Sequence, residues 1–126
     1  MPGAFILVCF NIVPTTEHYR VGMNIIRQDD TNRNFYILEK GVVEVIKDGV
    51  VLNTLMYPGT VFGEISAILD EPRSASIKAR TATTVTKYES TDLQRLIREQ
   101  PEMAAIMLET LARRLKYTTQ KLVDSL

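Results

Sequence analysis

One segment decides the interpretation of this sequence, namely Val61-Phe62-Gly63-Glu64-Ile65-Ser66-Ala67-Ile68-Leu69-Asp70-Glu71-Pro72-Arg73-Ser74-Ala75. Within it, Gly63 follows two strand-like residues and precedes a run long enough for about one and a half helical turns. A glycine at such a point lets a ligand or another backbone approach closely. The first amides of the short helix would lack internal partners and would favour an anion. The segment is therefore a candidate site for an anionic ligand.

Arg73 lies on the apolar side of the strand that we expect to follow it. Alternate residues of a strand share a face, and the residues that share a face with Arg73 are Ala75, Ile77 and Ala79. A guanidinium on an inward face needs an anionic partner, and its planar fork suits a phosphate. Taken singly, a turn at Gly63, a helix start at Glu64 and a solvated Arg73 are each sufficient explanations. Taken together, these residues favour a bound phosphate.

The motif Phe62-Gly63-Glu64-Ile65-Ser66 … Pro72-Arg73-Ser74-Ala75 resembles the phosphate-binding cassette of cyclic nucleotide-binding domains. The resemblance covers about residues 17–126, including the early segments 22–30, 35–38 and 41–45. It implies a fold that is mainly β with C-terminal α, an antiparallel β-roll or jelly-roll (double-stranded β-helix) with a short cassette helix. Turn residues that recur about every ten positions independently predict an antiparallel sandwich or barrel.

The resemblance also implies a role for each cassette residue. Arg73 would pair with the exocyclic oxygens of a cyclic phosphate, and Glu64 would accept the ribose 2′-hydroxyl. Gly63 would let the sugar lie close, and the Ser74 hydroxyl could touch the phosphate or a guanine amino group. The amides around Ile65, Ser66 and Ser74–Ala75 would donate to the phosphate. The ligand-binding residues expected in this segment are Phe62, Gly63, Glu64, Ile65, Ser66, Arg73, Ser74 and Ala75.

The sequence pattern predicts a single domain over residues 1–126, with an atypical segment at 1–16, the β-roll at 17–90 and helices at 91–126. Strands are expected at 35–38, 43–47, 50–55, 74–79 and 82–88, with Asp48-Gly49 as a hairpin turn. The capping-box spacing of residues 91–94 starts a helix near Asp92, and Pro101 fits the first turn of a second, longer helix.

The segment Leu111–Leu122 resembles the long dimerisation helix of bacterial catabolite-activator regulators. In that family, hydroxyl residues at the positions of Thr118 and Thr119 reach the adenine, one from each subunit. A coiled-coil seam repeats here at alternating spacings of three and four, through Leu108, Leu111, Leu115, Thr118, Leu122 and Ser125. We favour a homodimer through this helix, although the same stripe could pack on its own β-roll and the threonines could be exposed filler.

The sequence departs from the family pattern in three places. Asp29-Asp30 stands where the family has Gly-Asp, so that turn is expected to be strained or reshaped. Pro14 does not suit the helix that normally precedes the roll. The regulators continue into a helix-turn-helix reader, whereas this sequence ends at Leu126, so an effector on a separate protein is expected.

Composition excludes several other functions. Fifteen basic and fifteen acidic residues give no net charge, which argues against direct nucleic-acid binding and a polybasic membrane anchor. One cysteine and one histidine, Cys9 and His18, exclude a disulfide framework and Cys or His metal clusters, and disfavour a haem sensor. The apolar stretch at 4–10 is too short to span a membrane. We expect a cytoplasmic protein with no cofactor or metal.

These observations predict a binding module and not an enzyme, since no paired carboxylates, metal ligands or activated nucleophile occur at usable spacing. Its expected ligand is a cyclic mononucleotide, with cAMP favoured over cGMP. The module would act as a stand-alone sensor that signals through its C-terminal helix. The alternative is a ligand-independent interaction or oligomerisation module with a vestigial pocket.

Overall fold

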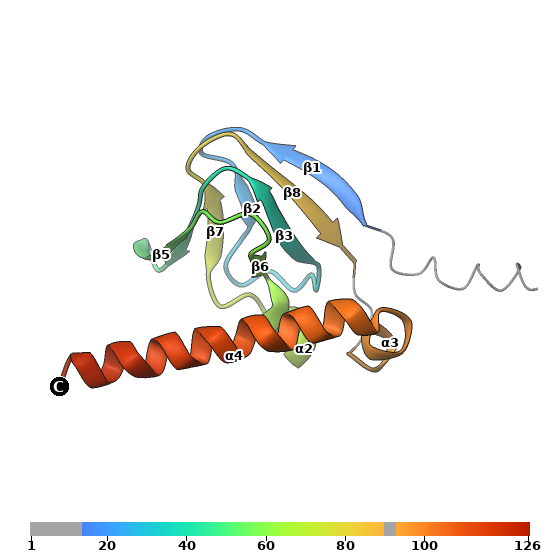
Figure 1. Cartoon of the computed structure of the whole chain (residues 1–126). Helices are drawn as coiled ribbons and strands as arrows, with labels where there is room; N and C mark the ends of the chain where they lie inside the picture. Colours follow the sequence, from blue (N-terminus) through green and yellow to red (C-terminus); the bar gives the residue numbers. More distant parts are fainter. Residues whose placement is uncertain (1–13, 90–92) are drawn as a thin grey trace, which may run out of the picture.

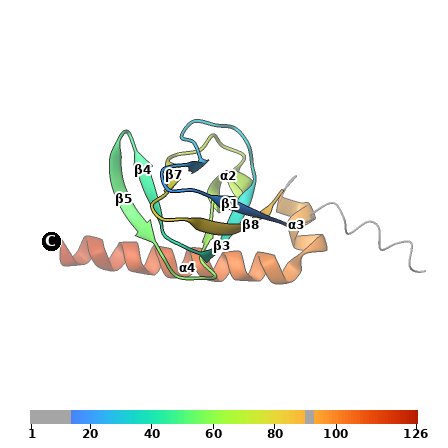
Figure 2. The ribbon, with the colours of Figure 1, turned by 90° about the horizontal axis from the view of Figure 1, so that it is seen from above.

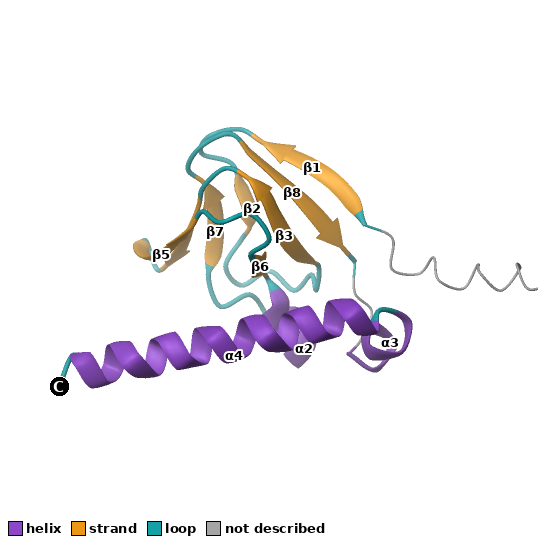
Figure 3. Cartoon of the chain, viewed as in Figure 1, coloured by secondary structure: helices purple, strands orange, loops and turns teal. Residues whose placement is uncertain are grey.

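The structure is a computed structural model that describes residues 14–89 and 93–126. Eight described strands form two four-stranded sheets, ordered β1-β8-β3-β6 and β2-β7-β4-β5, and each neighbouring pair is antiparallel. The strands are β1 (Thr15–Tyr19), β2 (Asn24–Ile26), β3 (Phe35–Lys40), β4 (Val43–Lys47), β5 (Val50–Leu55), β6 (Val61–Phe62), β7 (Ser76–Ala79) and β8 (Thr83–Tyr88). The helices are α2 (Glu64–Leu69), α3 (Leu93–Glu99) and α4 (Pro101–Asp124). Figure 3 shows the strands gathered in a roll, with the helices on one side of it.

The structure confirms the predicted mainly-β architecture with C-terminal helices. Asp48 and Gly49 join β4 to β5, and both have positive φ, 50° and 79°. A tight hairpin turn of this kind needs two such residues, and an Asp-Gly pair tolerates them best. The strand predicted over 74–79 begins slightly later, at Ser76. The expected capping box and residues 1–13 lie outside the described residues.

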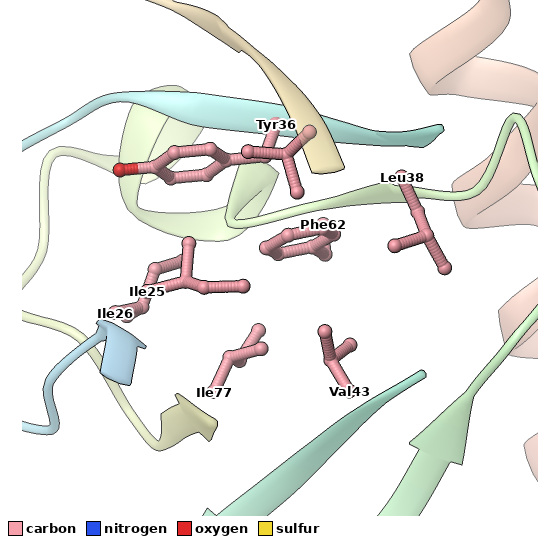
Figure 4. Close-up of a cluster of buried hydrophobic side chains, with 8 residues drawn as sticks. Ile25, Ile26, Tyr36, Leu38, Val43, Phe62 and Ile77 are labelled. Atoms are coloured by element: carbon pink, nitrogen blue, oxygen red, sulfur yellow. The ribbon is translucent and has the colours of Figure 1, made fainter. Parts of the chain in front are cut away.

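The principal core lies between the two sheets (Figure 4). Tyr36 stacks on Phe62, with ring centroids 5.2 Å apart. The buried residues of this cluster are Ile25, Ile26, Tyr36, Leu38, Val43, Phe62, Ile77 and Val85. Because Phe62 is the first residue of the cassette, the packing of this core fixes where the cassette begins.

A second core joins the helices to the roll. Successive residues of a strand point to opposite faces. Val61 accordingly packs in this second cluster, whereas its neighbour Phe62 packs in the first. The buried members of the second cluster are Phe35, Val61, Ala67, Leu96, Met103 and Met107. They come from β3, β6, α2, α3 and α4, so this core sets the position of α4 relative to the cassette.

Helix α4 runs below the roll in the view of Figure 1, and its C-terminal end reaches past β5 (Figures 1 and 2). Pro101 occupies its first turn, as the sequence predicts. Met103 and Met107 are buried against the roll, but Leu108, Leu115 and Leu122 are 65–70% exposed. These three seam leucines therefore do not pack on their own roll. None of the described helices is long and apolar enough to cross a membrane.

Candidate ligand-binding site

A cavity of about 190 Å³ opens between the cassette, the inner face of the roll and α4. All eight cassette residues predicted from the sequence line it: Phe62, Gly63, Glu64, Ile65, Ser66, Arg73, Ser74 and Ala75. The other lining residues are Ile26, Val45, Asn53, Leu55, Ile77 and Arg114. The cavity thus combines an apolar wall from the strands with charged groups from the cassette and α4.

Gly63 is the hinge between β6 and α2, and its backbone requires a glycine. Its φ of 81° lies in the left-handed region, which residues with a side chain rarely adopt. A Cβ atom here would lie 2.9 Å from Ile26 Cδ1 and 3.2 Å from Arg73 Nη1. Gly63 therefore allows the backbone to pass close to the Arg73 guanidinium at the edge of the cavity.

Arg73 is 3% exposed, which confirms that it faces inward. Its Nη1 donates to the Gly63 carbonyl at 2.8 Å, and its Nη2 donates to Asn32 Oδ1 at 2.7 Å and to the Asn34 carbonyl at 2.5 Å. Its buried Nε finds no partner among the described residues. Burial lowers the pKa of Arg73, against the opposing electrostatic effects of Tyr36, Asp30 and Glu64.

The groups that bind the Arg73 guanidinium are all neutral. Two backbone carbonyls and one side-chain amide orient it, and no described carboxylate forms an ion pair with it. A buried cation that is oriented but not neutralised favours an anionic ligand, because the ligand then supplies the missing charge. This geometry supports the expectation that the cassette binds a phosphate.

Glu64 is 1% exposed and forms an ion pair with Arg114 of α4. Arg114 Nη1 lies 2.5 Å from Oε1 and 2.7 Å from Oε2 of Glu64, and Arg114 Nη2 donates to the Val61 carbonyl. The carboxylate expected to accept a ribose hydroxyl is therefore also the group that binds α4 to the cassette.

Sequence reasoning missed Arg114 as a member of the site. Helical spacing places it seven residues after Met107 and eleven after Met103, on the face that packs against the roll. A basic residue on a buried helical face is the pattern that could have identified it. The residue beside it, Arg113, instead forms an exposed pair with Glu109 one turn earlier.

Sequence reasoning singled out the Asp29-Asp30 turn but missed that its loop, between β2 and β3, contacts the cassette. Within it, Asp29 has a φ of 73°, so the turn expected to be strained does adopt a left-handed backbone conformation. The Asp29 amide donates to the Arg73 carbonyl, and the Arg73 amide donates to the Asp30 carbonyl, both at 2.8 Å. This loop therefore fixes the main chain at Arg73 through two backbone hydrogen bonds.

Thr118 and Thr119 do not line the cavity and are exposed on α4, about one turn beyond Arg114. The structure of one chain thus does not bring them together with the cassette, and their contact with the base of a partner's ligand stays a prediction.

His18 lies on β1, also outside the cavity, and its Nδ1 is 3.0 Å from Thr84 Oγ1. Residues 14–89 and 93–126 contain no group of three or more His, Cys, Asp or Glu that could hold a metal ion.

Several solved structures and curated proteins are similar to this chain. The Thermus thermophilus catabolite activator protein superimposes with a TM-score of 0.72 and 29% identity, over 97% of this chain and 58% of that one. A structure described as "Sp-2Cl-cAMPS bound to PKAR CBD2" gives a TM-score of 0.66 and 25% identity, over 85% of this chain and 70% of that one.

A cAMP-dependent protein kinase regulatory subunit of Eremothecium gossypii is 35% identical over 82 residues, which is 65% of this chain and 18% of that protein. The chain spans about a fifth of the length of such curated relatives. The family model described as "Cyclic nucleotide-binding domain" matches residues 16–100, more than half of the chain. These relatives are regulatory and the matched domain is not catalytic, in agreement with the prediction of a binding module. The chain belongs to the cyclic nucleotide-binding domain family.

Proposed function

We propose that the cavity binds one cyclic mononucleotide, with cAMP preferred over cGMP, and that the domain acts as a sensor that signals through α4. The observation that carries this proposal is the buried Arg73 guanidinium, which lines the cavity, is oriented by neutral acceptors and lacks a partner at Nε among the described residues. A cyclic phosphate supplies the negative charge that this group needs.

In this proposal, the cassette residues contact different parts of the ligand. Arg73 binds the phosphate, together with amides around Ile65–Ser66 and Ser74–Ala75. Glu64 accepts the ribose 2′-hydroxyl, and Gly63 leaves room for the sugar beside it. Phe62 contributes the apolar wall of the cavity. All of these residues line the same cavity, which supports the assignment.

The preference for cAMP rests on α4 and on the relatives. Thr118 and Thr119 match positions that contact adenine in the catabolite-activator regulators, and the curated relatives are subunits of cAMP-dependent kinases. In a homodimer that pairs two α4 helices, each helix can bring these hydroxyls to the partner's cavity. The exposed leucines Leu108, Leu115 and Leu122 supply the apolar seam for that pairing.

Signalling follows from the contact between Glu64 and Arg114. A ligand that binds Glu64 alters the carboxylate that binds α4, so the ligand and the helix arrangement are thermodynamically linked. An effector would then recognise the changed surface of α3 and α4. Cytoplasmic localisation stays a prediction from the sequence.

One observation favours the alternative function, a ligand-independent interaction module. Arg114 of the same chain binds both carboxylate oxygens of Glu64. If that pair is permanent, the cavity is vestigial and α4 alone carries the function.

Titration calorimetry with cAMP, cGMP and 5′-AMP separates the two functions. We expect one cAMP per chain, weaker binding of cGMP, and little or no heat with 5′-AMP, whose phosphate is not cyclic. Thr118→Ala and Thr119→Ala should lower the preference for cAMP if α4 contacts the base. Absence of binding by all three nucleotides would favour the alternative, and an unchanged cAMP:cGMP ratio in both variants would remove the role of the threonines.

A further inference from the structure

The loop between β2 and β3 contacts the cassette at two places. The backbone hydrogen bonds of Asp29 and Asp30 fix the main chain of Arg73. Near the C-terminal end of α2, Arg33 donates to the Ala67 carbonyl at 2.7 Å and lies 3.5 Å from Asp70. The same loop therefore contacts both α2 and the segment that carries Arg73.

Asn32 is the side chain of this loop that reaches the guanidinium. Its Oδ1 accepts a hydrogen bond from Arg73 Nη2 at 2.7 Å and a longer one from the backbone N–H of Asn34 at 3.3 Å. Asn32 itself is exposed, whereas the group that it binds is buried. The contact joins residues 41 positions apart in the sequence, so it orients Arg73 from outside the cassette.

The chemical type of this acceptor is important. The oxygen of a side-chain amide fixes the direction of a guanidinium without cancelling its charge. A carboxylate at the same place would form an ion pair and reduce the attraction of Arg73 for an anion. The other two acceptors, the carbonyls of Gly63 and Asn34, are also neutral.

We propose that Asn32 is a positioning residue for the ligand's phosphate: it orients the Arg73 guanidinium while leaving its positive charge available. Its effect on nucleotide binding rests on the proposed function, whereas its effect on the orientation of Arg73 does not. Both effects can be measured, and they can fail separately.

The binding test compares Asn32→Ala, Asn32→Asp and a control in the same loop, Thr31→Ala. Asn32→Ala should weaken cAMP binding about tenfold, the size expected for losing a hydrogen bond that orients a charged group. It should cause no further loss in an Arg73→Ala background, because it acts through Arg73. Thr31 is exposed and makes no hydrogen bond that the structure records, so its variant should bind cAMP as the wild type does.

Asn32→Asp distinguishes positioning from a merely structural role. It retains an oxygen acceptor, so thermal stability should not fall, yet the added charge should weaken cAMP binding about as much as Asn32→Ala does. A structural role predicts that affinity and stability change together. An Asn32→Ala loss that persists in full without Arg73, or an Asn32→Asp variant that binds cAMP like the wild type, would overturn the proposal.

The orientation test uses the ligand-free protein and ¹H–¹⁵N spectra of arginine side chains. The Arg73 guanidinium signal, assigned by its absence in Arg73→Ala, should be sharp in the wild type and Asn32→Asp and broadened in Asn32→Ala. An unchanged Arg73 signal in Asn32→Ala would show that Asn32 does not orient it. If the wild-type protein binds no cyclic nucleotide, the proposed function fails and these spectra still decide the role of Asn32.

Discussion

Arg114 binds both carboxylate oxygens of Glu64, at 2.5 and 2.7 Å, although the two residues lie 50 positions apart in the sequence. Glu64 is almost completely buried, while about a third of the Arg114 side chain is exposed. The pair connects the start of the cassette to the middle of α4. It is therefore a direct contact between the cassette side of the cavity and α4.

Arg114→Ala tests this link through stability. The substitution leaves the Glu64 carboxylate buried without its charged partner, so the free energy of unfolding should fall by about 1–3 kcal/mol. Arg113→Ala is the matched control, because Arg113 pairs with Glu109 on an exposed face, and its effect should stay within about 0.5 kcal/mol. Denaturant unfolding of both variants checks this. Equal effects would mean that the Glu64 pair adds nothing beyond a surface pair.

Arg73→Ala tests the phosphate site. Loss of charge-assisted hydrogen bonds should weaken cAMP binding about 10- to 100-fold. The fold should survive, since the substitution removes a buried cation. Arg80→Ala is the control, because Arg80 is exposed and pairs with Glu44 on the surface. Calorimetry measures both variants, and an Arg73→Ala affinity within twofold of the wild type would refute the assignment.

Glu64→Gln tests the contact with the ribose. The amide keeps the shape of the carboxylate but is a weaker acceptor for a hydroxyl. Binding of cAMP should therefore weaken, and binding of 2′-deoxy-cAMP, which lacks that hydroxyl, should weaken less. Because the substitution also disturbs Arg114, the comparison between the two nucleotides matters more than either loss alone. Equal losses would show that Glu64 does not contact the ribose.

Leu115→Glu tests the dimer. The seam leucines are exposed in the single chain, so a charge among them should prevent two α4 helices from pairing. By linkage, cAMP should tighten the wild-type dimer, and dimerisation should tighten cAMP binding by the same factor. Ile97→Glu is the control, since Ile97 is similarly an exposed apolar residue but lies on α3. Sedimentation of the wild-type protein at high concentration measures the dimer directly. A monomer both with and without cAMP would rule out the seam.

The cassette could be predicted from the sequence because its residues are close together in the chain. The close approach at Gly63, the short helix and the inward side of Arg73 all follow from local spacing. The strand pattern and the Asp48-Gly49 turn are local in the same sense. Each of these features is fixed by backbone preferences and alternation, which short sequence windows contain.

The rest of the site could not be predicted, because it depends on long-range packing. Arg114 and Asn32 reach the cassette from 50 and 41 residues away, and both are polar residues that would suit a solvated surface equally well. Asn53 and Leu55 reach the cavity from β5 only because β4, β5 and β7 lie side by side. These contacts exist once the two cores have placed α4 and the loops around the cassette.

The most direct test of the account follows backbone amide signals in ¹H–¹⁵N spectra while cAMP is added to the purified protein. Saturable shifts should concentrate at residues 63–66 and 73–75, which line the cavity, and should extend to Arg114 on α4. The same titration with Arg73→Ala should need much more cAMP to reach saturation. Spectra that do not change, or shifts confined to residues outside the cavity, would contradict the claim that this domain senses a cyclic nucleotide through the cassette.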